Sequence, residues 1–303
     1  MKKMVYALLV LAGIFAAARL NADPVDWEKV ETVREGVKLA KLDVTDPRLM
    51  TIAIMRIDLT QKGLTFTGTP RDPDWGKPMP DWTNKVIRTL RVQTADFIRN
   101  ARAPREEGGL GLKMIVAANS APWAPWVPPY THRYGDPTGL NITDGIVISD
   151  HHVKAGAIFV VWKNGRPDIV SNIPEARYPE VWLAHSGFDI LMKNGKETFG
   201  KRGGDLHPRI AYGLSADRHY LYILTVDGRQ PERSLGANYS DLAKLMRDAG
   251  AADAINMDGG GSTTLIYWDD QQDAPVTCNY PVKGGAIRRN GMNMGIYLKE
   301  NRP

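Results

Sequence analysis

Cysteine is almost absent from this 303-residue chain, which contains only Cys278. A single cysteine cannot form an internal disulfide, so the fold depends on an apolar core rather than on covalent cross-links. About 280 residues are enough to enclose such a core. The sequence therefore excludes a small disulfide-rich scaffold. Because no long low-complexity linker or internal repeat divides it, it favours one large domain.

A large excess of charge of one sign is also absent. The formal net charge is +5, from 39 Lys and Arg against 34 Asp and Glu. Three of those basic residues, Lys2, Lys3 and Arg19, lie in a segment typical of a leader, and without them 36 − 34 leaves +2. Nucleic-acid-binding domains depend on a strongly basic surface, so we expect no nucleic-acid partner.

Long hydrophobic runs are missing as well. The run from Met4 to Ala18 has only 15 residues, too few for a comfortable membrane span. It follows two lysines and precedes small residues, which is the layout of a secretory signal peptide. We expect residues 1–22 to be removed after Ala22, with Ala18 as the second choice, and residues 23–303 to form the catalytic domain. The mature protein is then secreted or periplasmic and has no stable membrane span.

Several common catalytic motifs are missing too. The triple glycine at 259–261 is not followed by Gly-Lys-Ser/Thr, which removes support for a nucleoside triphosphate site. Ser262 lacks the Gly-x-Ser-x-Gly pattern of a hydrolase nucleophile. His151 and His152 are adjacent, so on a strand they face opposite ways, and no third ligand is suitably spaced for zinc.

Short apolar runs closed by polar turns dominate what is present. They predict strands at 37–42, 50–59, 64–66, 113–118, 146–149, 158–162, 181–185, 209–214, 221–226 and near 254–256. Helical spacing appears in only two segments, Thr83 to Asn100 with Thr83 as N-cap, and Ser240 to Ala249 with Ser240 as N-cap and Gly250 just past the end. Many strands with few helices predict an α+β fold: a single mixed, mostly antiparallel, β-rich domain.

The most informative stretch is Ala254 to Thr264, in which an apolar run leads through Asp258 into three glycines and three hydroxyl residues. Consecutive glycines are costly to order, so they suggest a backbone that takes positive φ or approaches another group closely. Their N–H groups can bind an anion, with Ser262 and Thr263 as further donors. The simpler alternative is a tight turn in which the aspartate caps its own backbone.

Other predicted strands also end in polar groups that could meet in one pocket. Arg209 opens an apolar strand and needs a partner, either an internal carboxylate such as Asp258 or a substrate phosphate. His185 is a candidate proton carrier or a buried imidazole bonded to backbone, and Asp227 is a candidate acid or a hairpin residue. The remaining polar groups at strand ends are Asn119, Ser186 and Gly187.

Residues 256–264, Asn-Met-Asp-Gly-Gly-Gly-Ser-Thr-Thr, resemble the phosphodiester glycosidase family. The resemblance covers about residues 36 to 298. It extends to Met55-Arg56-Ile57-Asp58-Leu59, to His207-Pro208-Arg209-Ile210-Ala211-Tyr212-Gly213-Leu214, to Leu224-Thr225-Val226-Asp227-Gly228-Arg229, to Asn279-Tyr280-Pro281, and to the segment from Arg288 to Asn293. Asn119-Ser120-Ala121-Pro122-Trp123 departs from the family's Asn-Gly-Gly-Phe-Phe, and Ile210 stands where threonine is usual. The tryptophans at 123 and 126 could stack on a sugar ring.

The resemblance implies hydrolysis of a sugar-1-phosphodiester between the anomeric carbon and the phosphate oxygen. Asp258 would face the anomeric carbon as nucleophile or base, and His185 or Asp227 would be the second acid or base. The phosphate would be held by Arg209 and the backbone from Gly259 through Gly260 and Gly261 to Ser262. Asn119 would bind a sugar hydroxyl. The expected partner is a carbohydrate phosphodiester or polysaccharide of the cell envelope or surroundings.

Two alternatives remain open. The chain could be a secreted glycan-binding module that grips polymer with Trp123 and Trp126. It could also be a metal-assisted phosphodiesterase that breaks the P–O bond, with Asp227 and Asp258 as oxygen ligands for a divalent cation. The phosphodiester glycosidase interpretation requires no cofactor.

Overall fold

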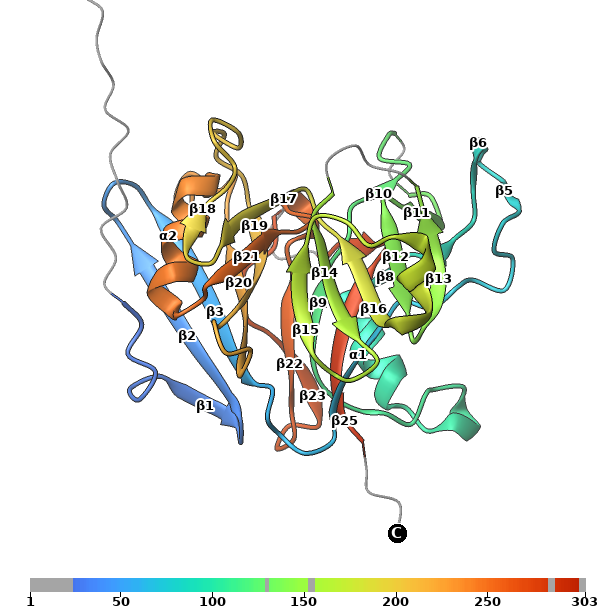
Figure 1. The fold of residues 1–303 in the computed structure, drawn as a ribbon, viewed down its shortest axis with the longest axis horizontal. Helices are drawn as coiled ribbons and strands as arrows, with labels where there is room; N and C mark the ends of the chain where they lie inside the picture. Colours follow the sequence, from blue (N-terminus) through green and yellow to red (C-terminus); the bar gives the residue numbers. More distant parts are fainter. Residues whose placement is uncertain (1–23, 129–130, 152–155, 283–286, 300–303) are drawn as a thin grey trace, which may run out of the picture.

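The computed structural model describes residues 24–128, 131–151, 156–282 and 287–299. The predicted leader and its cleavage site lie outside these residues. Within them, three larger antiparallel sheets and three small ones account for most of the regular structure, as Figure 1 shows. The predicted α+β, mostly antiparallel fold is confirmed.

The largest sheet has eight strands and lies on the left in Figure 1. In spatial order its strands are β1 (Glu31–Arg34), β2 (Val37–Val44), β3 (Met50–Asp58), β20 (Tyr220–Val226), β19 (Arg209–Leu214), β21 (Asp253–Asn256), β17 (Asp189–Lys193) and β18 (Lys196–Glu197).

Two five-stranded sheets pack beside it. The first is β23 (Ala274–Thr277), β22 (Leu265–Asp269), β9 (Lys113–Asn119), β25 (Asn293–Leu298) and β4 (Leu64–Gly68). The second is β13 (Ile146–Asp150), β12 (Leu140–Thr143), β16 (Val181–Ser186), β14 (Ile158–Trp162) and β15 (Pro167–Val170). The small sheets are β10 (Trp123–Ala124), β11 (Tyr134–Pro137) and β7 (Thr89–Leu90); β24 (Arg289–Asn290) and β8 (Val92–Gln93); and β5 (Pro78–Met79) and β6 (Trp82–Val86).

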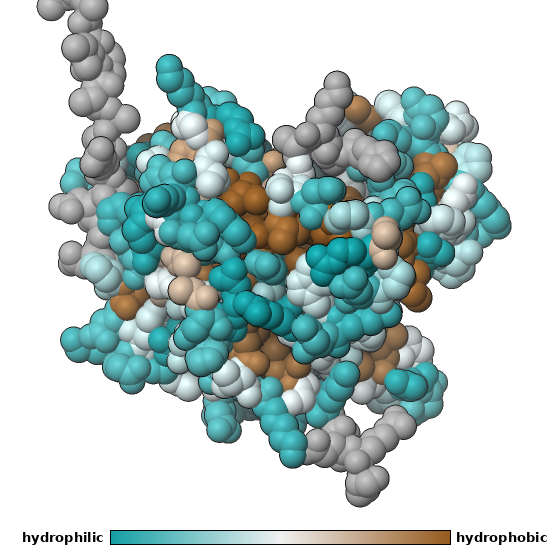
Figure 2. All heavy atoms as spheres, viewed as in Figure 1, coloured by the Kyte–Doolittle hydropathy of each residue, from teal (hydrophilic) through white to brown (hydrophobic). Residues whose placement is uncertain are grey.

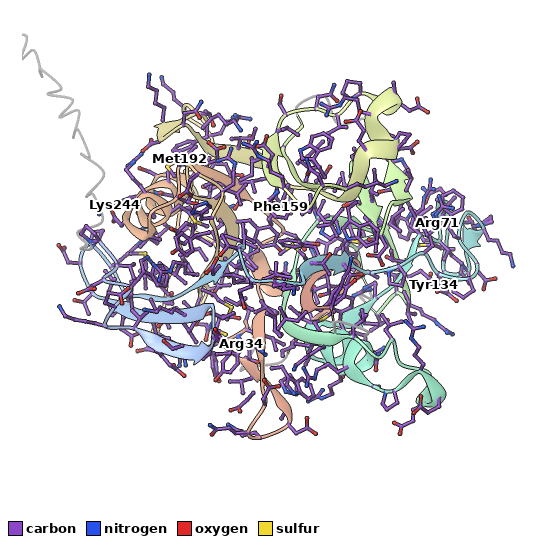
Figure 3. The ribbon with its side chains drawn as sticks, turned by 60° about the horizontal axis from the view of Figure 1, so that its bottom comes forward. Arg34, Arg71, Tyr134, Phe159, Met192 and Lys244 are labelled. Atoms are coloured by element: carbon purple, nitrogen blue, oxygen red, sulfur yellow. The ribbon has the colours of Figure 1, made fainter. Side chains whose placement is uncertain are left out.

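One apolar core joins the three larger sheets. Phe66 of β4, Phe159 of β14 and Tyr212 of β19 meet in it, with the rings of Phe159 and Tyr212 edge to face at 5.4 Å between centroids. Phe159 lies near the middle of the molecule in Figure 3. The alternating apolar residues that predicted these strands therefore face a shared interior, which fixes the register of each sheet.

Each α-helix covers the outer face of one sheet. Helix α2 (Tyr239–Ala249) packs its apolar side on the eight-stranded sheet, and α1 (Thr94–Arg102) packs on the sheet that contains β9 and β25. Three short 3-10 helices complete the helical structure of the described residues: Arg105–Glu107, Glu175–Glu180 and Gly260–Ser262.

Both helix starts differ from the sequence-based prediction. Asn238, not Ser240, caps α2, because its side chain accepts from the Asp241 N–H while the Asp241 carboxylate accepts from the Asn238 N–H. The C-terminal prediction is confirmed, since Gly250 takes the left-handed conformation at φ 105°. The first helix begins at Thr94 rather than Thr83, because Trp82–Val86 pairs with β5 as strand β6.

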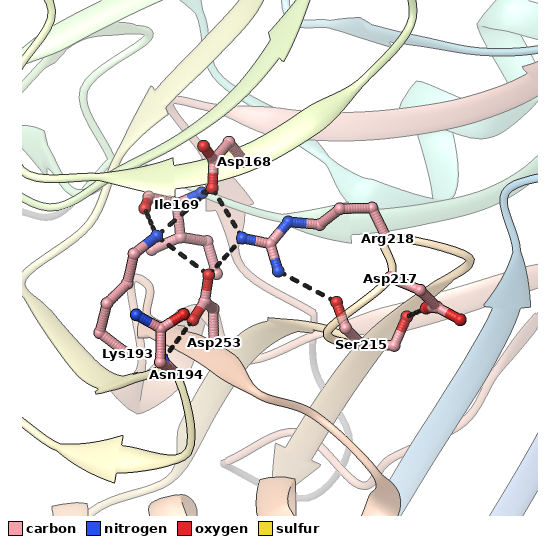
Figure 4. A network of polar contacts seen from close by, with 8 residues as sticks. All are labelled: Asp168, Ile169, Lys193, Asn194, Ser215, Asp217, Arg218 and Asp253. Carbon is pink, nitrogen blue, oxygen red and sulfur yellow. Dashed lines mark hydrogen bonds and ion pairs between the residues drawn. The ribbon is translucent and has the colours of Figure 1, made fainter.

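A buried ion-pair network fixes the start of β21, as Figure 4 shows. Asp253 is fully buried and accepts from Lys193 at 2.9 Å, from the Asn194 N–H and from Arg218. Arg218 also reaches Asp168 of β15 at 3.0 Å. The network therefore ties two sheets together at the end of β21 opposite to Asp258.

The molecular face in Figure 2 is largely hydrophilic, with apolar residues reaching the surface in patches across its middle. In the described part of the chain, no helix has the length and hydropathy required to cross a bilayer.

Candidate active site

The register of the eight-stranded sheet brings three distant segments to one edge. Strand β19 is antiparallel to both of its neighbours, with Arg209 opposite Val226 of β20 and Ala211 opposite Asn256 of β21. The first residue of β19 therefore lies beside the last residues of β20 and β21. Arg229 follows β20 and Asp258 follows β21, so these two residues and Arg209 gather at the same place.

A cavity of about 450 Å³ opens at this edge. It combines a glycine-rich loop, one carboxylate, three arginines, a histidine and an aromatic wall. Its lining residues are Pro122, Trp123, Trp126, Thr138, Phe188, His207, Arg209, Arg229, Asp258, Gly259, Gly260, Gly261, Ser262 and Arg288. The predicted convergence of Asp258, its glycines and Arg209 in one cavity is therefore observed.

Each of the three glycines meets a different steric limit. A side chain at Gly259 would put its Cβ 2.6 Å from the Pro208 carbonyl oxygen, and one at Gly261 would put it 2.3 Å from Arg288 Nη2. Gly260 has φ +62°, which only glycine adopts without strain. At Gly259 the loop thus lies too close to the backbone just before β19 for any side chain, whereas a side chain at Gly261 would require the Arg288 guanidinium to shift.

Asn119, the last residue of β9, hydrogen-bonds to both ends of this loop. Its Nδ2 donates to the Asp258 carbonyl at 2.6 Å, and its Oδ1 accepts from the Thr264 N–H at 2.9 Å. The side chain is fully buried, so the predicted contact with a sugar hydroxyl is wrong. Asn119 instead fixes the loop that connects β21 to β22 and contains Asp258.

The backbone of the loop offers fewer donors than three glycines suggest. The Gly260 N–H donates to the Pro208 carbonyl at 2.8 Å, and the Ser262 and Thr263 N–H groups donate to carbonyls within the loop itself. These donors are already in use inside the protein. The positive charge of the cavity comes mainly from guanidinium groups.

Arg288 and Arg209 are held firmly in the cavity wall. Arg288 Nη1 donates to Ser262 Oγ at 3.1 Å, and its guanidinium stacks on the Trp126 ring at 3.8 Å. Arg209 donates to the Ala237 and Asp205 carbonyls, at 3.1 and 3.0 Å. Burial lowers the pKa of both arginines, and both stay charged at neutral pH because a guanidinium ordinarily deprotonates only above pH 12.

Asp258 is the only carboxylate among the described residues that line the cavity. Burial raises its pKa to about 6, while a hydrogen bond from the Ser262 hydroxyl and the charge of Arg288 act in the opposite direction. The Ser262 hydroxyl accepts from Arg288, so a chain of donors runs from the guanidinium to the carboxylate. A carboxylate with a raised pKa inside a cleft is typical of a catalytic group.

His207 is a cavity residue that the sequence did not single out for catalysis. Its Nδ1 lies 3.3 Å from Arg229 Nη2. An arginine can only donate, so Nδ1 accepts and Nε2 carries the ring proton. Burial, together with the nearby Arg209 and Arg229, lowers the pKa of His207. The imidazole is therefore neutral near pH 7 and presents an N–H donor.

His185 and Asp227, the two predicted candidates for the second acid or base, are not among the residues that line the cavity. His185 is fully buried in β16, and burial lowers the pKa of its imidazole to about 3. Asp227 accepts from the Tyr280 N–H and from Asn279 Nδ2, and burial raises its pKa to about 6. Asp227 thus anchors the segment that follows β23.

Three predicted binding residues also lie elsewhere. Ser186 donates to the Leu140 carbonyl within its own sheet, and the Gly187 N–H donates to the Ala157 carbonyl. Gly187 packs so closely on β21 that a Cβ there would lie 2.5 Å from the Asn256 carbonyl oxygen. Thr263 is 2% exposed and does not line the cavity. The residue of this corner that does reach the cavity is Phe188.

Sequence reasoning missed the cavity roles of Arg229, Arg288, His207 and Phe188. Arg229 stood in a recognised hairpin and Arg288 in a recognised closing segment, but no spacing rule connects either to residue 258. The predicted aromatic wall is present, because Trp123 and Trp126 pack edge to face at 5.6 Å beside the cavity.

Among the described residues, no three His, Cys, Asp or Glu side chains gather in a way that could hold a metal ion. Asp258 lines the cavity, whereas Asp227 does not. His151 pairs with Asp136 at 2.8 Å, and His152 lies outside the described residues.

The model of the phosphodiester glycosidase family matches residues 126–297, which is more than half of the chain. No curated protein matches the sequence. The match includes every arginine and the carboxylate of the cavity.

Three solved structures share the fold. The catalytic domain of zebrafish N-acetylglucosamine-1-phosphodiester alpha-N-acetylglucosaminidase, auto-inhibited by its pro-peptide, is 19% identical, with a TM-score of 0.58 over 87% of this chain and 83% of that one. A hypothetical protein from Synechocystis is 11% identical, with a TM-score of 0.58 over 88% of this chain and 62% of that one. A protein from Burkholderia pseudomallei that is described as exported is 12% identical, with a TM-score of 0.54 over 82% and 74%.

Proposed function

Because this chain belongs to the phosphodiester glycosidase family, we propose that it hydrolyses sugar-1-phosphodiesters at the bond between the anomeric carbon and the phosphate oxygen. The observation that carries the proposal is the composition of the cavity. Three guanidinium groups and a single carboxylate with a raised pKa line one space of about 450 Å³. A phosphate fits the guanidinium groups, and a reacting carbon that gains positive charge fits the carboxylate.

The chemistry divides between these groups. Asp258, when ionised, either attacks the anomeric carbon and forms a glycosyl ester that water then hydrolyses, or takes the proton of a water that attacks the carbon directly. The carbon–oxygen bond breaks, and its electron pair leaves on the phosphate oxygen. A phosphomonoester is a good leaving group, so little help from a general acid is needed. This explains how the reaction proceeds although Asp258 is the only carboxylate among the described lining residues.

Arg209, Arg229 and Arg288 stabilise the negative charge that develops on the departing phosphate. Because Arg209 and Arg288 are held by hydrogen bonds in the cavity wall, they need little reorganisation during the reaction. The neutral His207 donates its Nε2 proton as a hydrogen bond to a phosphate oxygen. Trp126 and Phe188 at the mouth, 46% and 48% exposed, offer apolar faces to the sugar. Since the guanidinium groups supply the positive charge, we propose that no divalent cation is required.

We also propose that the protein is exported and acts on envelope or extracellular polysaccharide-type substrates. The support is the signal-peptide pattern of residues 1–22 and the exported description of one protein of the same fold. Expression of the full chain in a bacterial host, followed by mass measurement of the extracytoplasmic product, tests the export. The expected mass corresponds to cleavage after Ala22.

Hydrolysis in water enriched in oxygen-18 tests the reaction. With methyl N-acetylglucosamine-1-phosphate and related sugar-1-phosphodiesters as substrates, the label is expected in the anomeric hydroxyl of the released sugar, with or without a chelator. Label in the phosphate together with loss of activity in chelator would instead identify a metal-assisted phosphodiesterase. Binding without any turnover across the substrate panel would identify a glycan-binding module.

A further inference from the structure

A second cavity of about 450 Å³ lies away from the catalytic one. It is formed between the edge strand β4, the turn that joins β14 to β15, and the start of β16. Two half-buried tryptophans, Trp162 and Trp182, line it together with Lys163, Asn164 and Lys299. None of the lining residues belongs to the catalytic cavity.

Both indole rings are fixed in place. Trp182 Nε1 donates to the Phe66 carbonyl at 2.7 Å, which anchors the ring against β4. Arg177 stacks on Trp162 at 4.3 Å and is itself held by Glu180 at 2.8 Å. Fixed aromatic surfaces lose little conformational entropy when a ligand binds, and they suit the apolar face of a pyranose ring.

The surroundings of these rings are basic. Lys163, Arg166 and Lys299 are exposed, and among the described residues no carboxylate lies within ion-pair distance of any of them. The nearby Glu180 is paired with Arg177, and Asp168 is paired with Lys193 and Arg218. The ligand that complements this surface carries both sugar rings and negative charge.

The position of the cavity constrains the length of that ligand. Trp182 is the second residue of β16, the strand that leads to Phe188 at the mouth of the catalytic cavity, six residues further on. Most of this stretch is extended strand, which rises about 3.3 Å per residue, so the two positions lie about 20 Å apart along the chain. A single sugar phosphodiester cannot reach both places, whereas a polymer of several units can.

We propose that Trp162, Trp182 and the lysines beside them form a second binding site for a phosphate-bearing polysaccharide. The link to catalysis rests on the proposed function, because the site would hold a distant part of the chain whose terminal phosphodiester is cleaved. Addition of a peptide strand to β4 is the less favoured occupant, because the Trp182 indole already occupies the outward-facing Phe66 carbonyl.

Binding is measured in an Asp258→Asn background, so that the polymer is not consumed. The probes are yeast mannan that carries mannosyl phosphate and the same mannan after removal of its phosphate, in affinity electrophoresis. We expect Lys163→Glu with Lys299→Glu to weaken binding of the phosphorylated mannan by about tenfold, equivalent to about 1.4 kcal/mol. Trp162→Ala is expected to weaken binding of both mannans.

The matched control is Lys196→Glu with Lys201→Glu, which makes the same change of charge at exposed lysines in and just after β18 of the eight-stranded sheet. It is expected to change binding less than twofold. Equal loss of binding in the two double variants would show non-specific attraction. No loss in either would show that the second cavity does not bind the polymer. Both results overturn the proposal.

In the otherwise unchanged protein, hydrolysis of a small sugar-1-phosphodiester tests the proposed function separately. We expect Lys163→Glu with Lys299→Glu, and Trp162→Ala, to hydrolyse this small substrate at the parent rate. If the second-cavity variants lose polymer binding but no substrate of the panel is hydrolysed, the second binding site is supported and the proposed function is not. The two proposals can therefore fail independently.

Discussion

Asp258 is central to the proposed chemistry, and its buried charge also lowers the stability of the folded protein. Burial raises the pKa of its carboxyl from an ordinary 3.8 to about 6. The folded protein therefore holds this proton more tightly than the unfolded chain does. The proposed reaction needs the ionised form, which predominates only above about pH 6. The same desolvation that makes the group a suitable base makes its charged state unfavourable in the fold.

We predict that Asp258→Asn lowers kcat roughly 10²- to 10⁴-fold, the usual contribution of a positioned acid or base. In the parent protein, kcat/KM should rise with pH and level off above an apparent pKa of about 6. Steady-state kinetics between pH 4 and 8 measure both. Near-full activity of the variant would rule out the assigned role.

Although Asp258→Asn is expected to lower kcat, we expect it to raise the free energy of unfolding at neutral pH. A raised pKa contributes stability that is fully present below pH 4 and is lost as pH rises through about 6. The amide of the variant would stay neutral, so the unfolding free energy of Asp258→Asn relative to the parent should increase between pH 4 and pH 8. The upper bound is about 3 kcal/mol, because a pKa shift from 3.8 to about 6 corresponds to about 3 kcal/mol. The partial exposure of Asp258 reduces the effect below that bound. Urea unfolding at both pH values measures it.

At the scale of elements, β21 has a structural end and a functional end. Asp253 begins it inside the ion-pair network of Figure 4, and Asp258 follows its last residue at the cavity. Burial raises the pKa of Asp253, but bonds from the Asn194 N–H, Lys193 and Arg218 outweigh this, so its pKa lies below the ordinary value. The short strand thus connects a firmly anchored start to the glycine-rich loop that follows Asp258.

We predict that Asp253→Asn destabilises the fold by about 1.5–3 kcal/mol at pH 7, because Lys193 and Arg218, whose side chains are 37% and 13% exposed, lose a fully buried carboxylate and keep only Asp168. The depressed pKa means that this loss diminishes as pH falls below about 4. Asp217→Asn is the control, since Asp217 is 57% exposed and its pairing with His219 is worth little. Chemical unfolding compares them, and equal midpoints would contradict the structural role of the network.

Strands such as β21 were largely predictable, whereas the starts of both helices were not. The strands at 50–59 and 209–214 were found because their apolar residues form compact runs. The start of α1 was misplaced because Trp82–Val86 has apolar residues near helical spacing yet pairs with Pro78–Met79. Pairing with another strand is a tertiary event that local spacing does not report.

At the scale of the whole molecule, the segment before β1 is part of the core. Trp27 is 8% exposed, donates from Nε1 to the Ala249 carbonyl at 2.9 Å, and packs against Tyr222. The Arg56 guanidinium lies over the same ring at 4.8 Å. A residue close to the predicted start of the mature chain therefore closes the outer face of the large sheet beside α2.

We predict that Trp27→Ala lowers the unfolding free energy by about 3–5 kcal/mol, the usual cost of removing a buried aromatic ring. Trp27→Phe, which keeps a ring but loses the indole N–H, should cost less than half of that. Because the cavity lies elsewhere, kcat of the folded variant should not change. Thermal unfolding and kinetics at about 20 °C provide the two measurements, and a change in kcat would contradict this separation.

The sequence by itself determined the local features of this protein: its strand content, its dependence on an apolar core and the glycine-rich loop after Asp258. These follow from interactions between near neighbours, such as side-chain alternation and the conformational freedom of glycine. The tertiary structure alone decided which polar residues share a cavity. Arg288 reaches the cavity through its contacts with Ser262 and Trp126, whereas His185 and Asp227 are buried outside it. Arg209 and Arg229 join Asp258 because antiparallel register places the start of β19 beside the ends of β20 and β21. That pairing links residues tens of positions apart, and no local pattern records it.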